Sequence, residues 1–262
     1  MKLSISNIAW DESKDLEIYS LMHEHSYRYL EIAPTRIFPT EPYNNIELAA
    51  EWAKNLLNNY NLKISSMQSI WYGRTENIFS LERERNLLIE YSKKAINFAE
   101  AIGCKNLVFG CSKNRKFSDD TNIAIAIPFF EAIGNYAYEH NSVIGLEANP
   151  KIYDTNYINT TGEAINLIKQ VNSPGFKLNL DIGTIIANNE EIEIIEENIN
   201  LINHVHISEP YLQPIKNHLL HKHIAKILKH NNYNGCVSIE MKNGLTVLEI
   251  SKIMEYVKNL FS

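Results

Sequence analysis

Cysteine is scarce in this chain, and the few cysteines lie far apart. The 262 residues include three of them, Cys104, Cys111 and Cys236, with no CxxC pair. This spacing offers no framework of disulfides or zinc–thiolate ligands, and it suits a reducing compartment. Cys111 is expected to follow a strand, where we interpret it as an incidental thiol rather than a nucleophile.

The sequence also lacks segments that would direct it to a membrane. No apolar run approaches the roughly 20 residues that a membrane-spanning helix needs. The first ten residues, MKLSISNIAW, have neither the basic nor the apolar region of a secretory signal. We therefore expect a cytoplasmic protein without a membrane partner.

Positive charge and nucleotide-binding loops are missing as well. The formal net charge is -6 and the pI is about 5.9, which opposes broad attraction to nucleic acid. No GxGxxG motif follows a predicted strand, and no Walker-type lysine loop occurs. We therefore expect neither a nucleic-acid partner nor a nucleotide cofactor.

What the chain does contain is a regular alternation of short apolar stretches and helical segments. Apolar residues recur at i, i+3, i+4 and i+7 in segments such as 81–103, behind a cap at Ser80, and 162–171, behind a cap at Thr161. Strands that alternate with helices about every 30 residues form parallel βαβ units, and eight such units fit a closed barrel. We therefore predict an α/β fold, a single (β/α)8 TIM barrel that forms one domain over residues 1–262. The expected strands are 2–6, 29–33, 62–69, 106–110, 143–149, 177–181, 204–208 and 236–241.

Four consecutive strands of this predicted barrel end on a side chain that can bind a metal. These are Glu147, Asp181, His206 and Glu240. Because the carboxyl ends of the strands meet at one face of a barrel, the four side chains should lie close together. Three neighbouring carboxylates repel one another unless a cation or protons compensate them. The set predicts one divalent metal ion, with manganese, magnesium or cobalt favoured by the mostly oxygen ligands and zinc or iron as alternatives.

The motifs along the chain resemble those of a known family. The sequences LEIAPTRIF, MQSIWYGR and VFGCSKNR follow or close the second to fourth expected strands, and LEANP, LDIGT, HVHISEP and NNYNGCVSIEM accompany the fifth to eighth. Together they resemble the sugar phosphate isomerase/epimerase family of xylose-isomerase-like TIM barrels. The resemblance extends over nearly the whole chain.

The resemblance implies a function and assigns roles to residues. Its metal ligands correspond to Glu147, Asp181, His206 and Glu240, and its acid and base correspond to Glu147 and Glu240. It implies a metal-dependent isomerase or epimerase that acts on a small carbohydrate through proton abstraction and an enediolate. It is also compatible with a homodimer, and a dehydratase would use the same residues.

Several residues on the loops of the same face are candidates for substrate binding. An amide and two arginines could bind hydroxyl, phosphate or carboxylate groups, and two indoles could form an apolar wall for a sugar. Loop hydrogen bonding, solvated arginines and core aromatic rings are the alternatives. The five candidates are Gln68, Arg74, Arg115, Trp10 and Trp71.

Two further residues lie inside the expected barrel. Glu31, within the second strand, could hydrogen-bond across the mouth of the barrel. His204 shares the strand face of His206, so we interpret it as a packing residue one layer lower.

Two other functions use a related barrel. An endonuclease IV-like, metal-dependent hydrolase of abasic DNA would need additional histidines where this chain has Gln68, the FGCS turn and Thr184. Many relatives carry a histidine at the position of Thr184, which weakens expectations about substrate hydroxyl contacts there. A sugar-binding barrel without turnover is the second alternative, and the presence of all four ligands argues against it.

Overall fold

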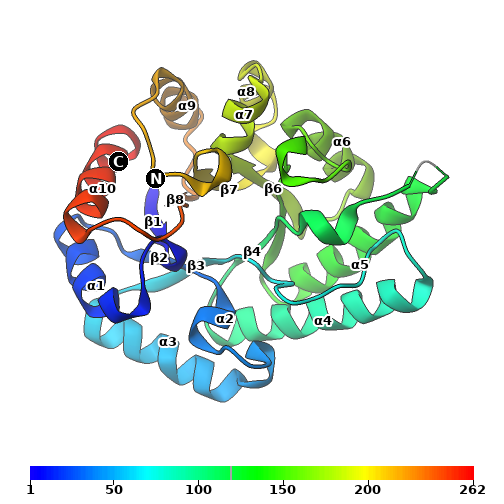
Figure 1. Cartoon of the computed structure of the whole chain (residues 1–262), viewed down its shortest axis with the longest axis horizontal. Coiled ribbons are helices and arrows are strands. Elements are labelled where there is room, and N and C mark those ends of the chain that lie inside the picture. The colour runs from blue at the N-terminus through cyan, green and yellow to red at the C-terminus, as the bar shows by residue number, and fades with distance from the viewer. Residues whose placement is uncertain (119) are drawn as a thin grey trace.

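The computed structural model describes residues 1–118 and 120–262, and its centre is a closed barrel of eight parallel strands. Figure 1 shows the strands as a ring with helices around it. Each strand pairs with the next along the chain, and β8 closes the ring by pairing with β1. The predicted (β/α)8 barrel is therefore confirmed. The strands are β1 (Lys2–Ser6), β2 (Tyr29–Ile32), β3 (Lys63–Met67), β4 (Asn106–Phe109), β5 (Val143–Leu146), β6 (Phe176–Asp181), β7 (Ile202–Ile207) and β8 (Cys236–Ile239).

Helices cover the outside of the ring and follow each strand in turn, as βαβ units require. Short helices in the loops accompany the longer ones. The helices are α1 (Asp15–Glu24), α2 (Pro34–Ile37), α3 (Ile46–Tyr60), α4 (Glu82–Ala101), α5 (Ala126–Glu139), α6 (Thr161–Val171), α7 (Ile182–Asn188), α8 (Glu193–Glu197), α9 (Leu219–His230) and α10 (Val247–Phe261).

The helix starts differ in detail from the sequence predictions. Leu81, not Ser80, precedes α4, and it makes no side-chain cap. Thr160, not Thr161, caps α6, where it forms a capping box with Glu163 that satisfies two backbone amides. Both predicted positions were therefore one residue off, which is within the range by which helix ends vary.

The core lies between the ring and its helices, and a second set of side chains fills the ring itself. Ile5, Leu30, Leu107 and Val205 are fully buried strand residues of the apolar core. Among the described residues, no helix is long and apolar enough to cross a membrane. Because every strand points the same way, their carboxyl ends and the following loops converge on one face.

Candidate metal centre

Four ionisable side chains converge where β5 to β8 end. Glu147 follows β5, Asp181 closes β6, His206 lies one residue before the end of β7, and Glu240 follows β8. The His206 Nδ1 lies 2.9 Å from Glu147 Oε2 and 3.3 Å from Glu240 Oε2. One ligand atom from each of the four lies within 4.8 Å of the others. The structure thus brings together the four side chains that the sequence suggested as ligands.

Asp181 is held in place by the beginning of α7. Its Oδ2 accepts a hydrogen bond of 2.8 Å from the Thr184 amide, which makes it the N-cap of that helix. Ser208 donates its hydroxyl to Oδ1 and accepts the Gly183 amide at 2.8 Å. A Cβ on Gly183 would lie 2.7 Å from Ser208 Oγ, so this close approach requires glycine. Both carboxylate oxygens of Asp181 are therefore oriented before any ligand binds.

Glu147 is oriented by amide groups and by a buried guanidinium. The Asn179 side-chain amide donates to Glu147 Oε2 at 2.8 Å, and the Asn149 amide donates to Oε1 at 3.3 Å. Arg115 Nη2 donates to the backbone carbonyl of Glu147 at 2.9 Å and to Asn149 Oδ1 at 2.6 Å. A Cβ on Gly110 would lie 2.7 Å from Glu147 Oε1, so Gly110 leaves room for this carboxylate.

The electrostatics of the cluster call for positive charge. Burial raises the pKa of Asp181 to about 6, with the Glu147 carboxylate adding to the rise. Burial also raises the pKa of Glu240 to about 7. Burial disfavours the charged form of His206, but the Glu240 and Glu31 carboxylates outweigh it and hold the imidazole pKa well above its usual value. The cluster therefore retains protons near neutral pH, and a divalent cation would supply the same compensation.

The chemistry of the donor set fits a divalent metal ion. Three carboxylates and one imidazole nitrogen form a mostly hard ligand set on a rigid frame of strand ends. The Asn179 and Ser208 contacts orient the carboxylates in the way that outer contacts orient metal ligands in proteins. The cluster could therefore hold one divalent ion.

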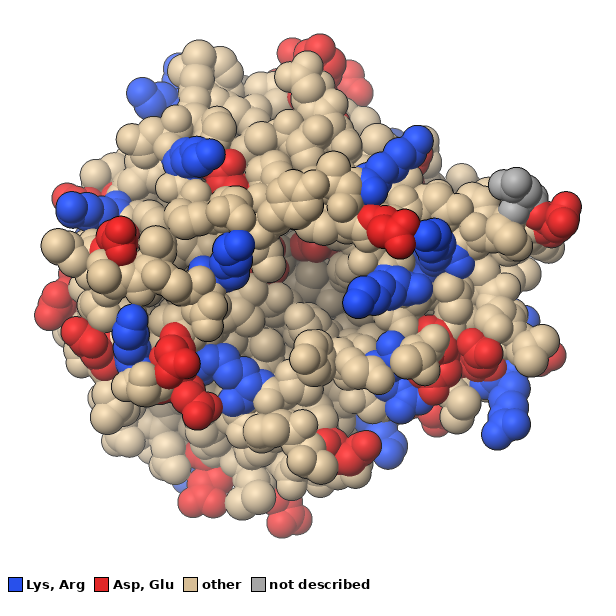
Figure 2. Space-filling view, viewed as in Figure 1, with Lys and Arg blue, Asp and Glu red and all other residues tan. Residues whose placement is uncertain are grey.

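A cavity of about 610 Å³ opens onto the cluster, with Glu147, Asp181 and Glu240 in its lining. The loops after β3 and β4 line another part of this cavity, with Gln68, Trp71, Tyr72, Gly110, Cys111 and Lys113 among their residues. The loops after β5 and β7 also contribute to the lining, through Asn149, Tyr153, Ser208, Glu209 and Leu212. A second cavity of about 560 Å³ shares Ser69 and Tyr72 with the first. Figure 2 shows a hollow at the centre of this face, with acidic side chains in its depth and basic ones around its rim.

Three of the five predicted substrate-binding residues line the main cavity. Gln68 donates its amide to Ser6 Oγ at 2.6 Å and lies next to the cluster in the lining. Trp71 is 2% exposed, and its ring packs edge-on against Phe109. Arg74 pairs with Glu76, so part of its guanidinium is already engaged.

The other two predicted residues lie elsewhere. Arg115 is fully buried, does not line the cavity, and donates to Glu147 and Asn149 instead. The short helix Ser112–Arg115 turns the guanidinium inward, which the sequence did not reveal. Trp10 is 2% exposed, donates its indole N–H to Asp15 at 2.7 Å, and borders the second cavity rather than the main one.

Sequence reasoning missed the polar residues that orient the ligands. Asn179 lies two residues before Asp181 on the same strand face, so the period of two along a strand was a usable signal. Ser208 follows His206 by the same spacing. Asn149 had no such signal, because its contact depends on the loop after β5.

The Cys111 thiol borders the cavity but is not activated. Burial raises its pKa to about 12, so the thiolate form is rare near neutral pH. This agrees with the interpretation of Cys111 as an incidental thiol.

Comparisons with known proteins agree with this geometry. The family model of xylose isomerase-like TIM barrels matches residues 20–259. No curated protein matches the sequence. The barrel is similar to a 3-keto-D-glucoside 4-epimerase from E. coli, at 19% identity and a TM-score of 0.79 over 99% of each chain. It is also similar to a D-psicose 3-epimerase from Clostridium cellulolyticum H10, at 15% identity and a TM-score of 0.80 over 100% of each chain.

A protein described as an AP endonuclease, family 2, from Brucella melitensis has the same architecture. It is 18% identical, with a TM-score of 0.73 over 100% of this chain and 97% of the other. At such identities these likenesses show the fold, while the family rests on the match over residues 20–259. The chain belongs to the family of xylose isomerase-like TIM barrels.

Proposed function

We propose that the protein is a metal-dependent isomerase or epimerase of a small sugar, sugar phosphate or related polyhydroxy carbonyl compound. One observation carries this proposal: three carboxylates and the His206 Nδ1 converge within 4.8 Å beside a cavity of about 610 Å³. Cavities of a few hundred Å³ are typical of sites for small ligands. The sugar epimerases that share this fold are consistent with the assignment.

The carboxylates of Glu147 and Glu240 are the proposed proton-transfer groups. One removes the proton from the carbon next to the substrate carbonyl, and the electron pair of that C–H bond forms an enediolate. For an epimer, the other carboxyl group, protonated beforehand, donates its own proton to the opposite face of the same carbon. For an isomer, a proton is returned to the neighbouring carbon instead.

The proposed metal ligands are Glu147, Asp181, His206 and Glu240. A divalent ion bound there would stabilise the negative charge that develops on the substrate oxygens. Hydrogen bonds from Ser208 and Thr184 hold both carboxylate oxygens of Asp181.

The first test measures the metal itself. We expect about one divalent ion for each wild-type chain purified without chelator, and loss of that ion in Asp181→Ala. Glu12→Ala is the matched control, because Glu12 is an exposed carboxylate at the second cavity. Failure of the wild type to bind manganese, magnesium, cobalt, iron or zinc after reconstitution would overturn the proposal.

The second test measures proton exchange. Ketoses, inososes and their phosphates are incubated with enzyme in deuterium oxide, and the loss of the α C–H signal is followed by NMR. Exchange that requires both metal and Glu240 supports an enediolate route. A metal-loaded enzyme that binds a sugar without exchange would instead show a binding barrel.

The nuclease alternative predicts a different metal count. A three-zinc site needs ligands near the ends of β3 and β4 and after Asp181, where Gln68, Gly110 and Thr184 stand. The formal net charge of -6 also opposes binding to DNA. About three zinc ions for each chain, with cleavage of abasic DNA, would replace the proposed function with this one.

A further inference from the structure

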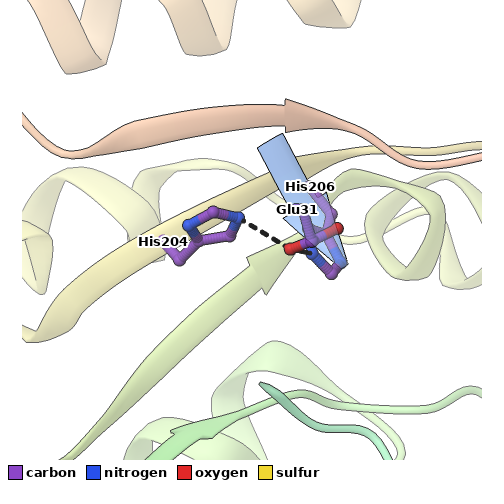
Figure 3. A group of neighbouring side chains, drawn as sticks. All are labelled: Glu31, His204 and His206. Carbon is purple, nitrogen blue, oxygen red and sulfur yellow. Dashed lines mark hydrogen bonds and ion pairs between the residues drawn. The ribbon is translucent and has the colours of Figure 1, made fainter. Parts of the chain in front are cut away.

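Glu31 is a carboxylate buried inside the barrel, below the proposed metal centre. It lies on β2 and is 0% exposed. Figure 3 shows its carboxylate directed at the rings of His204 and His206 on β7. Glu31 Oε2 lies 2.9 Å from His206 Nε2 and 3.1 Å from His204 Nε2. A buried carboxylate persists only where hydrogen bonds or charges compensate its lost hydration, so these contacts need an explanation.

The two nitrogens of His206 face different partners. Its Nε2 is within hydrogen-bond distance of Glu31, while its Nδ1 faces Glu147 and Glu240. An ionised carboxylate only accepts hydrogen bonds, so the Nε2 must carry the proton that it shares with Glu31. In a neutral imidazole this leaves a lone pair on Nδ1, which is the form that binds a metal.

His204 contacts Glu31 less favourably than His206 does. Its Nε2 approaches the same oxygen of Glu31, but the contact lacks the alignment of a hydrogen bond. The ring stands nearly perpendicular to that of His206, with centroids 5.2 Å apart, so His204 packs beside the Glu31–His206 contact.

A second metal ion at this level would conflict with the first. Glu31, His204 and His206 do each offer a ligand atom within 4.8 Å of the others. However, His206 would then have to bind a metal through both nitrogens, and it would lose the Nε2 proton that Glu31 accepts. A single metal ion at Nδ1 and the Glu31 carboxylate at Nε2 together provide a partner for each nitrogen of His206.

We propose that Glu31 is a positioning residue of the metal centre, which holds His206 in the Nε2–H tautomer and turns its Nδ1 toward the three carboxylates. This inference rests on the proposed metal centre, since it assigns the residue that prepares one of its ligands. Such outer carboxylates fix the orientation and raise the basicity of metal-binding histidines in general. Glu31 therefore acts on the metal through His206 and does not touch the substrate.

The test compares metal affinity in three variants. Glu31→Leu removes the acceptor, and Glu31→Gln keeps an amide oxygen of similar shape. Ser4→Ala is the matched control, because it removes a buried hydrogen bond of 2.7 Å to Ser65 elsewhere inside the barrel. Titration with Co²⁺, followed by visible absorption, should show affinity about 10- to 100-fold weaker in Glu31→Leu. We expect a smaller loss in Glu31→Gln and an unchanged value and spectrum in Ser4→Ala.

A second readout reports the tautomer directly. In protein labelled with ¹⁵N-histidine and loaded with Zn²⁺, the wild type should show a protonated, hydrogen-bonded Nε2 on the metal-binding ring. Glu31→Leu should shift or lose that N–H signal, and Glu31→Gln should retain it. If Glu31 had only a structural role, both Glu31 variants would lower the thermal stability of the metal-free protein, and the N–H signal would not differ between them. If Glu31→Leu does not fold, the affinity and N–H signal of Glu31→Gln decide the matter.

The outcomes separate this inference from the proposed function. Wild-type affinity and an unchanged N–H signal in both Glu31 variants would overturn the positioning role and leave the metal centre intact. Equal losses of metal affinity in the Glu31 variants and in Ser4→Ala would also overturn it, because removal of any buried polar group would then weaken metal binding. Absence of metal binding in the wild type would overturn both.

Discussion

The two halves of the barrel differ sharply at their carboxyl ends. Strands β5 to β8 end on or beside Glu147, Asp181, His206 and Glu240. Strands β1 to β4 end beside uncharged residues, among them Asn7, Ala33, Gln68 and Gly110. We call β5–β8 with their loops the ligand half and β1–β4 with their loops the wall half.

This difference separates two tasks that one cavity must combine. The ligand half concentrates negative charge that a metal can use, while the wall half contributes Gln68, Trp71 and Tyr72 to the cavity lining. A substrate would therefore lie between the carboxylates of the ligand half and the amide and aromatic side chains of the wall half. The halves meet below the cavity, where Glu31 of β2 contacts His206 of β7. Changes in the ligand half should affect chemistry, and changes in the wall half should affect substrate choice.

The largest expected effect comes from removing one of the two proposed proton-transfer groups in the ligand half. Glu147→Gln or Glu240→Gln should lower kcat about 10²- to 10⁴-fold, because a neutral amide can neither accept nor return the proton. The fold should persist, since the amide has nearly the same shape. Steady-state kinetics on a substrate found by the exchange screen, together with circular dichroism, checks both points.

Glu12→Gln is the matched control for these variants. It neutralises an exposed carboxylate at the second cavity and should leave kcat unchanged. Full activity in Glu147→Gln and Glu240→Gln would remove the chemical distinction between the two halves.

Much of this comparison was accessible from the sequence. The alternation of apolar stretches and helical segments predicted eight strands, and all eight occur, with ends that differ by a few residues. The side chains at the ends of β5–β8 could be grouped without knowing any loop, because parallel strands of a barrel end at one face. Glu147, Asp181, His206 and Glu240 were therefore the predictable part of the candidate site.

The remainder depends on geometry that a linear pattern does not encode. Arg115 turns inward because of the short helix after β4, and it supports Glu147 from behind. The Glu31–His206 contact joins residues 175 positions apart across the ring. The register between β2 and β3 also shifts between Leu30 and Glu31, so strand parity alone could not show what Glu31 faces.

The second prediction concerns stability, and it tests whether the carboxylates at the strand ends of the ligand half need a cation or protons to balance their charge. Asp181 and Glu240 have pKa values raised to about 6 and about 7 in the fold, so these two carboxyl groups bind more protons in the folded metal-free protein than in the unfolded chain between about pH 4 and about pH 7. Their contribution to the free energy of unfolding therefore falls as pH rises through this window. As pH rises through this window, we expect Asp181→Asn and Glu240→Gln to become more stable relative to wild type, by on the order of 6 kcal/mol for both together.

Denaturant unfolding of chelator-treated protein at several pH values measures this change. Addition of a divalent ion to the wild type should oppose the decline, because it replaces the lost protons. A difference between variant and wild type that does not vary with pH would contradict the assigned shifts.

The third prediction concerns a histidine on an outer helix of the ligand half, away from the carboxylates at the strand ends. His221 on α9 is buried, its Nδ1 lies 3.0 Å from the Tyr256 hydroxyl, and burial lowers its pKa to about 4. The unfolded chain therefore binds more protons than the fold as pH falls from about 6.5 to about 4, and stability falls with it. This is the opposite sign to the carboxylates at the mouth. His221→Phe should reduce the acid-side loss by on the order of 2 kcal/mol without changing metal affinity, and unchanged acid sensitivity would refute the assignment.

The smallest expected effect tests the wall half. Tyr72 is 71% exposed and borders both cavities, so its replacement should cost little stability. Tyr72→Ala should raise KM about fivefold, which corresponds to about 1 kcal/mol of lost contact with a sugar ring, and should leave kcat and metal affinity nearly unchanged. Tyr72→Phe retains the ring and should restore most of the loss. If Tyr72→Ala instead lowers kcat as much as Glu240→Gln, the wall half takes part in the chemistry, and the division between the halves fails. A change confined to KM would locate substrate recognition in the wall half, across the cavity from the four proposed metal ligands.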